Sequence, residues 1–270
     1  MNHAPKNAWF SVLAGVHRPR ATLICFAYGG GNAAAFRAWA RHAPADVQIL
    51  GVELPGRGVR FGAAPLTRVA DVIDALLAQR DFLAQQGQLI LFGHSLGALL
   101  AFEFARALQR TGALAPVHLV ASGRGAPHLA RREAPVHALP DAQFLAQVRR
   151  FEGLPDAVLQ HAELLEIFLP ILRADFALSE TYECMPGAPL DCDLTVLGGT
   201  RDPMVDVATL APWREHTRGR FACRMFDGGH FFLNDHAAQI VALALRDEHA
   251  IVTAPALPAA HESPNLTCTS

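Results

Sequence analysis

Short apolar runs alternate with longer amphipathic stretches along most of this chain. The apolar runs are too short for ordinary helices, and several are rich in β-branched residues, which is typical of buried strands. They predict strands at 22–27, 47–52, 88–92, 117–121, 194–197 and 220–226. Helical spacing of apolar positions predicts helices at 33–41, 69–86, 98–110, 210–216 and 236–246. The alternation predicts an α/β fold whose mostly parallel central sheet is covered by helices on both faces.

One long segment interrupts the alternation between the strands predicted at 117–121 and 194–197. It contains helical patterns at 141–148, 163–169 and 171–178, and it lacks a strand pattern. An insertion of this size in a doubly wound sheet is expected over the carboxyl ends of the strands, where ligands bind. We expect a helical lid insertion at about 127–187 whose apolar faces form an acyl pocket. The alternative is that these helices only extend the core.

The two ends of the chain set the expected domain limits. Residues 8–16 faintly resemble a signal peptide, but the apolar stretch is short and is followed by His17-Arg18-Pro19-Arg20 without a convincing cleavage site. No run approaches the roughly 20 apolar residues needed to span a bilayer. Residues 253–270 are rich in Ala, Pro, Ser and Thr, which predicts a disordered tail. We expect one domain over 1–252 in a soluble, cytoplasmic protein.

Composition and charge exclude several classes of partner. Hydrophobic residues make up 51% of the 270 positions, which is enough for a large core. The formal net charge of −2 provides no electrostatic attraction for nucleic acid or an anionic membrane. The five cysteines are odd in number and form no C-x-x-C pair, so we expect a reduced compartment and no disulfide framework or zinc site.

The candidate chemistry starts at Gly93-His94-Ser95-Leu96-Gly97. This G-x-S-x-G sequence follows a predicted strand and precedes a predicted helix, which is the context of a nucleophile elbow. Such an elbow lifts the Ser95 hydroxyl out of the sheet and directs the first N–H groups of the helix toward the same point. The pattern predicts acyl transfer through a covalent ester on Ser95. The alternative is a glycine-containing turn with an incidental serine.

A serine nucleophile needs an orienting carboxylate that follows it in the chain on a later strand–loop junction. Asp202 satisfies this order, because it lies in a turn after the strand predicted at 194–197, and Pro203 cannot continue that strand. Asp206 and Asp227 are the competitors. Asp206 falls in the following helix and Asp227 precedes its turn, so Asp202 is the predicted acid.

The base should be a histidine after the last strand. His230 follows the strand predicted at 220–226 through a Gly-Gly turn and is the predicted base. His94 is the competitor, because it adjoins Ser95, but its side chain should point away from Ser95 on the elbow. The remaining histidines are expected to be solvent-facing or locally satisfied.

Two N–H groups are needed to stabilise the oxyanion that forms after attack. Leu96 supplies one by its place at the start of the elbow helix, and the second is expected from the loop after an earlier strand. The loop Tyr28-Gly29-Gly30-Gly31-Asn32 fits, because consecutive glycines let the backbone approach a ligand closely. A flexible turn without a catalytic part is the alternative.

Six sequence blocks resemble the type II thioesterases, the stand-alone editing hydrolases of polyketide and nonribosomal peptide assembly lines. The resemblance covers about Trp9 to Leu245, and Leu54-Pro-Gly-Arg-Gly58 is its most discriminating block. The blocks are Cys25-Phe-Ala-Tyr-Gly-Gly-Gly31 with Phe36 and Trp39, Val52-Glu-Leu-Pro-Gly-Arg-Gly-Val-Arg60, Phe92-Gly-His-Ser-Leu-Gly-Ala98, Leu172-Arg-Ala-Asp175, Gly198-Gly-Thr-Arg-Asp-Pro203 and Gly228-Gly-His-Phe-Phe232.

The resemblance implies an α/β-hydrolase fold and a catalytic triad of Ser95, Asp202 and His230. It places the oxyanion N–H groups on Gly29 and Leu96. The chain departs from the family before its paired glycines, where Pro, a polar residue and Ala are usual and this chain has Ala27, Tyr28 and Gly29. A backbone donor survives such a change, whereas the rigidity of the loop and the shape of the entrance are affected.

The resemblance also implies the substrate, which is an acyl or aminoacyl thioester on the phosphopantetheine arm of an acyl or peptidyl carrier protein. No metal or organic cofactor is expected, nor a nucleic acid or membrane partner, and the chain is expected to be a monomer. Carrier proteins tend to be acidic, so we expect one or more of five arginines on the docking face, with solvated surface as the alternative for each: Arg57, Arg60, Arg124, Arg131 and Arg132. A general carboxylesterase or lipase and an acyltransferase remain alternatives, and a noncatalytic binding module is the least favoured.

Overall fold

A mostly parallel sheet forms the centre of the molecule. The computed structural model describes residues 7–112, 114–131, 134–150 and 161–246, so the tail expected at 253–270 lies outside the described residues. Within that part the sheet has seven strands in the order β1-β3-β2-β4-β5-β6-β7. The strands are β1 (Phe10–Ala14), β2 (Ala21–Phe26), β3 (Val47–Val52), β4 (Gln88–His94), β5 (His118–Ser122), β6 (Asp193–Gly199) and β7 (Phe221–Phe226).

The six predicted strands are confirmed, with ends that differ by at most two residues. All of them pair in parallel. The seventh strand, β1, was not predicted and runs antiparallel to β3, with Phe10 opposite Val52. It occupies the segment that faintly resembles a signal peptide. Because β1 is an edge strand, only Phe10 is buried in it and Val12 is 59% exposed, so its apolar positions do not form a continuous buried run.

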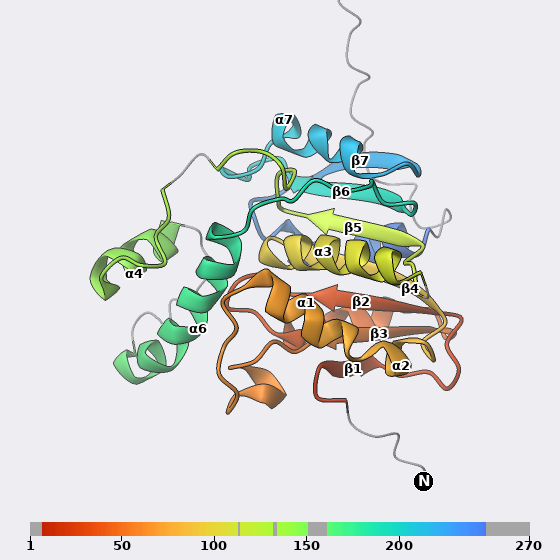
Figure 1. Cartoon of the computed structure of the whole chain (residues 1–270), viewed down its shortest axis with the longest axis horizontal. Coiled ribbons are helices and arrows are strands. Elements are labelled where there is room, and N and C mark those ends of the chain that lie inside the picture. Colours follow the sequence, from red (N-terminus) through yellow and green to blue (C-terminus); the bar gives the residue numbers. More distant parts are fainter. Residues whose placement is uncertain (1–6, 113, 132–133, 151–160, 247–270) are drawn as a thin grey trace, which may run out of the picture.

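Helices cover both faces of the sheet, as expected (Figure 1). On one face, α1 (Val69–Leu77) and α3 (Leu96–Thr111) pack into a core that includes Phe102, Phe104 and Trp213. On the opposite face, the 3-10 helix η1 (Ala33–His42) and α8 (Ala237–Leu245) enclose a second core. The shorter helices are η2 (Gly58–Arg60), α2 (Arg80–Leu83), α7 (Val207–Leu210), η3 (Ala211–His216) and η4 (Phe232–Asn234).

Three helical predictions need correction. The segment predicted as a helix at 210–216 is the 3-10 helix η3, which follows the short helix α7 directly. The single helix predicted at 69–86 is divided into α1 and α2, because Gln79 leaves the helical region with ψ of 12°. The segment predicted as a helix at 33–41 is a 3-10 helix, which begins after Asn32, whose side chain accepts a hydrogen bond from the Ala34 N–H. All three differences concern local backbone geometry, which apolar spacing does not specify.

The insertion lies beyond the carboxyl ends of the parallel strands, where α4 (Asp141–Arg150) and α6 (Ala162–Glu180) project from the sheet (Figure 1). Phe144, Val148 and Leu172 form a small core of their own between these helices. Leu178, near the end of α6, joins the main core instead. The patterns at 163–169 and 171–178 belong to one helix with Pro170 inside it. The insertion therefore has its own packing and is anchored to the sheet domain through the end of α6.

Among the described residues, no helix is both long and apolar enough to cross a membrane.

The elbow at β4 and α3 requires glycine on both sides of Ser95. A Cβ atom at Gly93 would lie 2.0 Å from the Gly97 carbonyl oxygen, and one at Gly97 would lie 2.1 Å from the carbonyl oxygen of Phe26. Both neighbours are backbone atoms of packed elements, so they cannot move aside as a flexible side chain would. The glycines thus permit α3 to pack closely against β2 and β4.

Replacing Gly97 with alanine should destabilise the fold by about 1–3 kcal/mol, because overpacking forces backbone shifts. Thermal unfolding followed by circular dichroism measures the effect, and for a chain of this size it amounts to a fall in Tm of several degrees, at about 2–4 °C per kcal/mol. Gly62→Ala is the control, since no atom lies within 4 Å of a Cβ at Gly62. Equal Tm values for the two variants would contradict the close packing at Gly97.

Candidate active site

Ser95 lies at the sharp turn between β4 and α3. Its φ of 55° and ψ of −115° are rare for a residue with a side chain, and strain of this kind is concentrated at functional sites. The Ser95 N–H donates to the carbonyl oxygen of Ser122 at the end of β5, over 2.8 Å, which fixes the turn to the neighbouring strand. Its side chain makes no capping hydrogen bond to α3. The elbow therefore presents the hydroxyl at the carboxyl edge of the sheet.

His230 and Asp202 form a hydrogen-bonded pair at the same edge. The Nδ1 atom of His230 lies 2.7 Å from Oδ2 of Asp202, and the side chains are 8% and 0% exposed. The other carboxylate oxygen of Asp202 accepts the Met204 N–H over 2.9 Å, which holds the carboxylate in place. With Asp202 ionised, its bond requires a proton on Nδ1, so Nε2 of the neutral imidazole is left as an acceptor.

The two competing carboxylates lie elsewhere. Asp227 pairs with Arg201 and has a side chain that is 75% exposed. Asp206 accepts the Thr209 N–H as the N-cap of α7, in a reciprocal capping box. Neither has a hydrogen bond to His230 in the described part of the chain. The structure thus brings Asp202, and not its competitors, to the predicted base.

His94 does not line the cavity that contains Ser95. Its ring is completely buried, with Nδ1 2.9 Å from the Ser122 hydroxyl, and it packs 4.9 Å from the ring of His230. Burial, reinforced by the nearby His230, lowers the pKa of His94 well below its usual range, so the ring stays neutral at pH 7. His94 is therefore a packing residue beneath the base. The sequence did not reveal this contact with His230.

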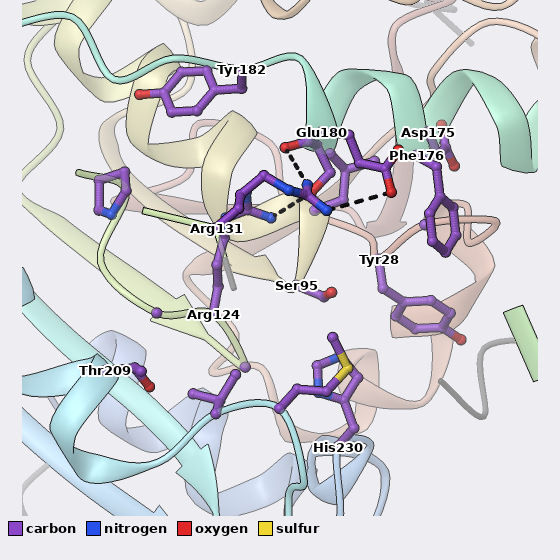
Figure 2. Close-up of a pocket in the computed structure, with 18 of the residues that line it drawn as sticks. Tyr28, Ser95, Arg124, Arg131, Asp175, Phe176, Glu180, Tyr182, Thr209 and His230 are labelled. Atoms are coloured by element: carbon purple, nitrogen blue, oxygen red, sulfur yellow. Dashed lines mark hydrogen bonds and ion pairs between the residues drawn. The ribbon is translucent and has the colours of Figure 1, made fainter. Parts of the chain in front are cut away.

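One cavity of about 530 Å³ contains the candidate residues Ser95, Leu96, His230 and Gly29 in its wall. In Figure 2, Ser95 and His230 face the cavity from the sheet, and α6 carries Asp175, Phe176 and Glu180 on its other side. Both the loops at the strand ends and the insertion thus contribute to the wall. A volume of this size is in the range of small-molecule sites.

Gly29 and Leu96, the predicted oxyanion donors, both line the cavity that contains Ser95. In residues 7–112 and the other described ranges, neither backbone N–H has an acceptor among the hydrogen bonds outside regular elements. For Leu96 this is expected, because the first N–H groups of a helix have no partner within the helix. Within the loop that contains Gly29, the Tyr28 carbonyl oxygen accepts the Gly31 N–H over 2.9 Å.

A buried ion pair lies against the same loop. Arg57 donates to both oxygens of Asp175, over 2.5 and 2.6 Å, and the two side chains are 5% and 1% exposed. Asp175 also accepts the Gly30 N–H over 2.6 Å. Both residues belong to blocks that carry the family resemblance, but the residues are 118 positions apart, and sequence reasoning did not pair them.

The five arginines considered for carrier docking have different environments. Arg57 is wrong as a docking residue, because the pair with Asp175 buries it. Arg60 stacks its guanidinium 3.7 Å from the Trp9 ring, and Arg131 pairs with Glu180. Arg124 lines the cavity and donates to the Ser179 hydroxyl, and burial lowers its pKa to about 10. Arg132 lies outside the described residues.

No group of three or more His, Cys, Asp or Glu side chains in the described ranges is arranged to hold a metal ion.

Comparisons with known proteins agree with the geometry. A family model described as a thioesterase domain matches residues 21–247. The gramicidin S biosynthesis protein GrsT of Aneurinibacillus migulanus is 37% identical over 236 residues, which cover 87% of this chain and 91% of that protein. The thioesterase PikA5 of Streptomyces venezuelae is 41% identical over 218 residues, which cover 81% and 77% of the two chains.

Solved structures give the same result. BorB, described as a type II thioesterase from the borrelidin biosynthetic cluster, superposes with a TM-score of 0.80 at 34% identity, covering 92% of this chain and 100% of its own. RedJ, from the prodiginine pathway of Streptomyces coelicolor, gives 0.74 at 38% identity, covering 84% and 85%. The predicted α/β-hydrolase fold and the resemblance to thioesterases are both confirmed. The chain belongs to the thioesterase family.

Proposed function

We propose that this chain is a serine thioesterase that releases acyl or aminoacyl groups from the phosphopantetheine arm of carrier proteins in polyketide or nonribosomal peptide biosynthesis. The observation that carries the proposal is that Ser95 and His230 line one cavity, with His230 hydrogen-bonded to Asp202, in a chain of the thioesterase family. The assembly-line context is supported by GrsT, a gramicidin S biosynthesis protein, and by the structural relative YbtT, described as a type II thioesterase from the yersiniabactin NRPS/PKS pathway. The carrier-bound substrate is our extension from those relatives.

In the proposed reaction, Ser95 is the nucleophile, His230 the base and Asp202 the orienting acid. His230 takes the Ser95 proton through Nε2 while Oγ attacks the thioester carbonyl carbon. The tetrahedral intermediate collapses, the carbon–sulfur bond breaks and His230 returns its proton to the leaving thiolate. Water then loses a proton to His230 and attacks the acyl ester. Release of the acid restores the Ser95 hydroxyl, so no external oxidant or cofactor is consumed.

Gly29 and Leu96 are proposed as the two oxyanion donors. Their N–H groups stabilise the negative charge on the carbonyl oxygen in both halves of the cycle, where one such donor contributes roughly 10² to 10³ in rate. Asp202 keeps Nδ1 protonated and stabilises the imidazolium that forms during attack. The helical insertion at about 127–187 serves as the lid, since α6 supplies Leu172 and Phe176 to the cavity wall.

The proposed setting is the cytoplasm, with the chain acting as a monomer. In the described part of the chain Cys25, Cys184, Cys192 and Cys223 are free thiols, in agreement with a reducing compartment. Burial raises the pKa of the Cys25 thiol well above its usual range, so it is unreactive as a nucleophile.

A panel of acyl-loaded carrier proteins tests the proposed substrate. We expect mass spectrometry to show conversion of acyl-carrier to free carrier and the free acid, with kcat/KM at least 10-fold above that for simple oxygen esters of the same acyl group. The equivalent acyl-coenzyme A thioesters are the matched control for carrier recognition. Faster turnover of the oxygen esters would identify a general esterase or lipase, and transfer of the acyl group to an acceptor other than water would identify an acyltransferase. Either result would refute the proposal.

A further inference from the structure

The buried Arg57–Asp175 pair joins three segments at the edge of the cavity. Arg57 lies in the turn after β3, Asp175 lies on α6 of the insertion, and Gly30 in the loop after β2 donates its N–H to Asp175 over 2.6 Å. Arg57 also donates to the Gly31 carbonyl oxygen over 3.3 Å. The pair therefore binds the glycine loop both through a donor and through an acceptor.

The desolvation cost of a buried ion pair indicates that Arg57 and Asp175 do more than stabilise the fold. Moving two charges out of water costs several kcal/mol per ion, and a hydrophobic pair of similar volume is often equally stable. Here the cost is offset by charge-assisted hydrogen bonds, since Asp175 Oδ2 accepts from both Arg57 and Gly30. Of the four hydrogen bonds made by the two side chains, two join Arg57 to Asp175, and the other two go to the backbone of Gly30 and Gly31. Such a pair specifies the position of the loop.

The loop is also enclosed sterically by α6. A Cβ atom at Gly30, which has φ of 78°, would lie 2.9 Å from Leu172 Cδ2, and one at Gly29 would lie 3.7 Å from the Asp175 Cβ. The Gly29–Gly30 backbone is therefore in contact with the turn of α6 that carries Asp175. A displacement of α6 would move the hydrogen-bond acceptor of Gly30 and change the direction of the adjacent Gly29 N–H.

We propose that Arg57 and Asp175 are positioning residues that hold the Gly29 N–H toward the oxyanion and make the oxyanion site dependent on the placement of α6. This inference rests on the proposed function, because it takes Ser95 as the nucleophile. Neither side chain touches the reacting atoms in this account. Their effect is exerted through the backbone at Gly29 and Gly30.

Asp175→Asn is the sharpest test, because an amide keeps the size and one acceptor oxygen while it removes the charge that binds Arg57. We expect kcat to fall by about 10- to 100-fold on a short-chain acyl thioester, with KM changed less than about 3-fold, since an oxyanion donor acts in the transition state. Asp46→Asn is the matched control. It removes the carboxylate of the ion pair between Asp46 and Arg20, whose side chains are 54% and 58% exposed respectively. Because exposed ion pairs contribute little, this substitution should leave kcat unchanged.

A transition-state analogue separates positioning from folding. An alkyl boronic acid forms a tetrahedral adduct with a serine hydroxyl, so its inhibition constant should rise in proportion to the loss of kcat/KM in Asp175→Asn. Arg57→Lys is the second variant, because it retains a charge but not the two parallel hydrogen bonds. We expect the effects of the two substitutions to be non-additive in the double variant, since both act through one pair.

Three outcomes overturn the inference: unchanged kcat in folded Asp175→Asn, a rise in KM alone, or a boronate inhibition constant that does not follow kcat/KM. Should Asp175→Asn fail to fold, the same criteria apply to Arg57→Lys, and loss of folding in both variants would indicate a purely structural pair and also refute the inference. The proposed function fails in a different way, because the unmodified protein would then turn over oxygen esters faster than acyl carriers or would release no free acid from them, whatever the effect of Asp175→Asn.

Discussion

Replacing Ser95 with alanine should lower kcat/KM by about 10⁴-fold or more, while the fold is retained. Loss of a serine nucleophile removes the covalent route completely and leaves only the oxyanion donors and substrate binding. The Ser95 side chain makes no capping hydrogen bond to α3, so its removal breaks no such structural contact. Steady-state hydrolysis of an acyl thioester measures the fall in kcat/KM, and a thermal unfolding curve shows whether the fold is retained.

Covalent labelling identifies the nucleophile directly. A fluorophosphonate should modify the unaltered protein once, and peptide mass spectrometry should place the adduct on Ser95. Ser179→Ala is the matched control, because Ser179 is a second serine in the same cavity wall and its loss should leave labelling of Ser95 in place. Substantial turnover or continued labelling in Ser95→Ala would show that the nucleophile is elsewhere.

Asp202→Asn should reduce kcat by about 10³- to 10⁴-fold. The amide cannot stabilise the imidazolium, and it can donate to Nδ1, which would favour the neutral tautomer with its proton on Nε2 and leave no acceptor for the Ser95 hydroxyl. Because the side chain of Asp202 is fully buried and in contact with His230, the effect should appear in kcat on every acyl thioester substrate, whatever its chain length. The measurement is kcat and KM for two acyl lengths.

Asp227→Asn is the control for this substitution, since Asp227 was the competing acid in the sequence and is 75% exposed beside Arg201. It should change kcat less than about 2-fold, because exposed ion pairs contribute little. A large loss in Asp227→Asn together with a small one in Asp202→Asn would reverse the assignment of the acid.

Local sequence patterns were sufficient to predict the parallel part of the fold. Strands such as β2 and β4 are buried along nearly their whole length, so they form uninterrupted apolar runs that a helix-covered sheet requires. β1 could not be recognised in the same way. It lies at an edge and pairs with a strand far along the chain, and only that pairing makes a strand of the segment 10–14.

The candidate site shows the same division between local and long-range information. Ser95, Asp202 and His230 could be selected because each follows its own strand, and parallel strands bring those loops to one edge. The Arg57–Asp175 pair could not be derived, because the position of α6 over the loop depends on packing between distant segments. The same reason explains why Arg57 was expected on the surface and lies buried.

The division of polar contacts around α6 has a practical consequence for protein engineering. A chimera that receives the insertion of a relative in order to change acyl preference would retain the host's turn at 56–58 and its glycine loop. The transplanted helix would carry residue 175, which accepts the Gly30 N–H, whereas the host would supply residue 57, the cation that pairs with it. A choice of crossover points alone would therefore not preserve the hydrogen bond and the ion pair together. Successful exchange requires residues 57 and 175 to be inherited as a unit with the loop between β2 and η1.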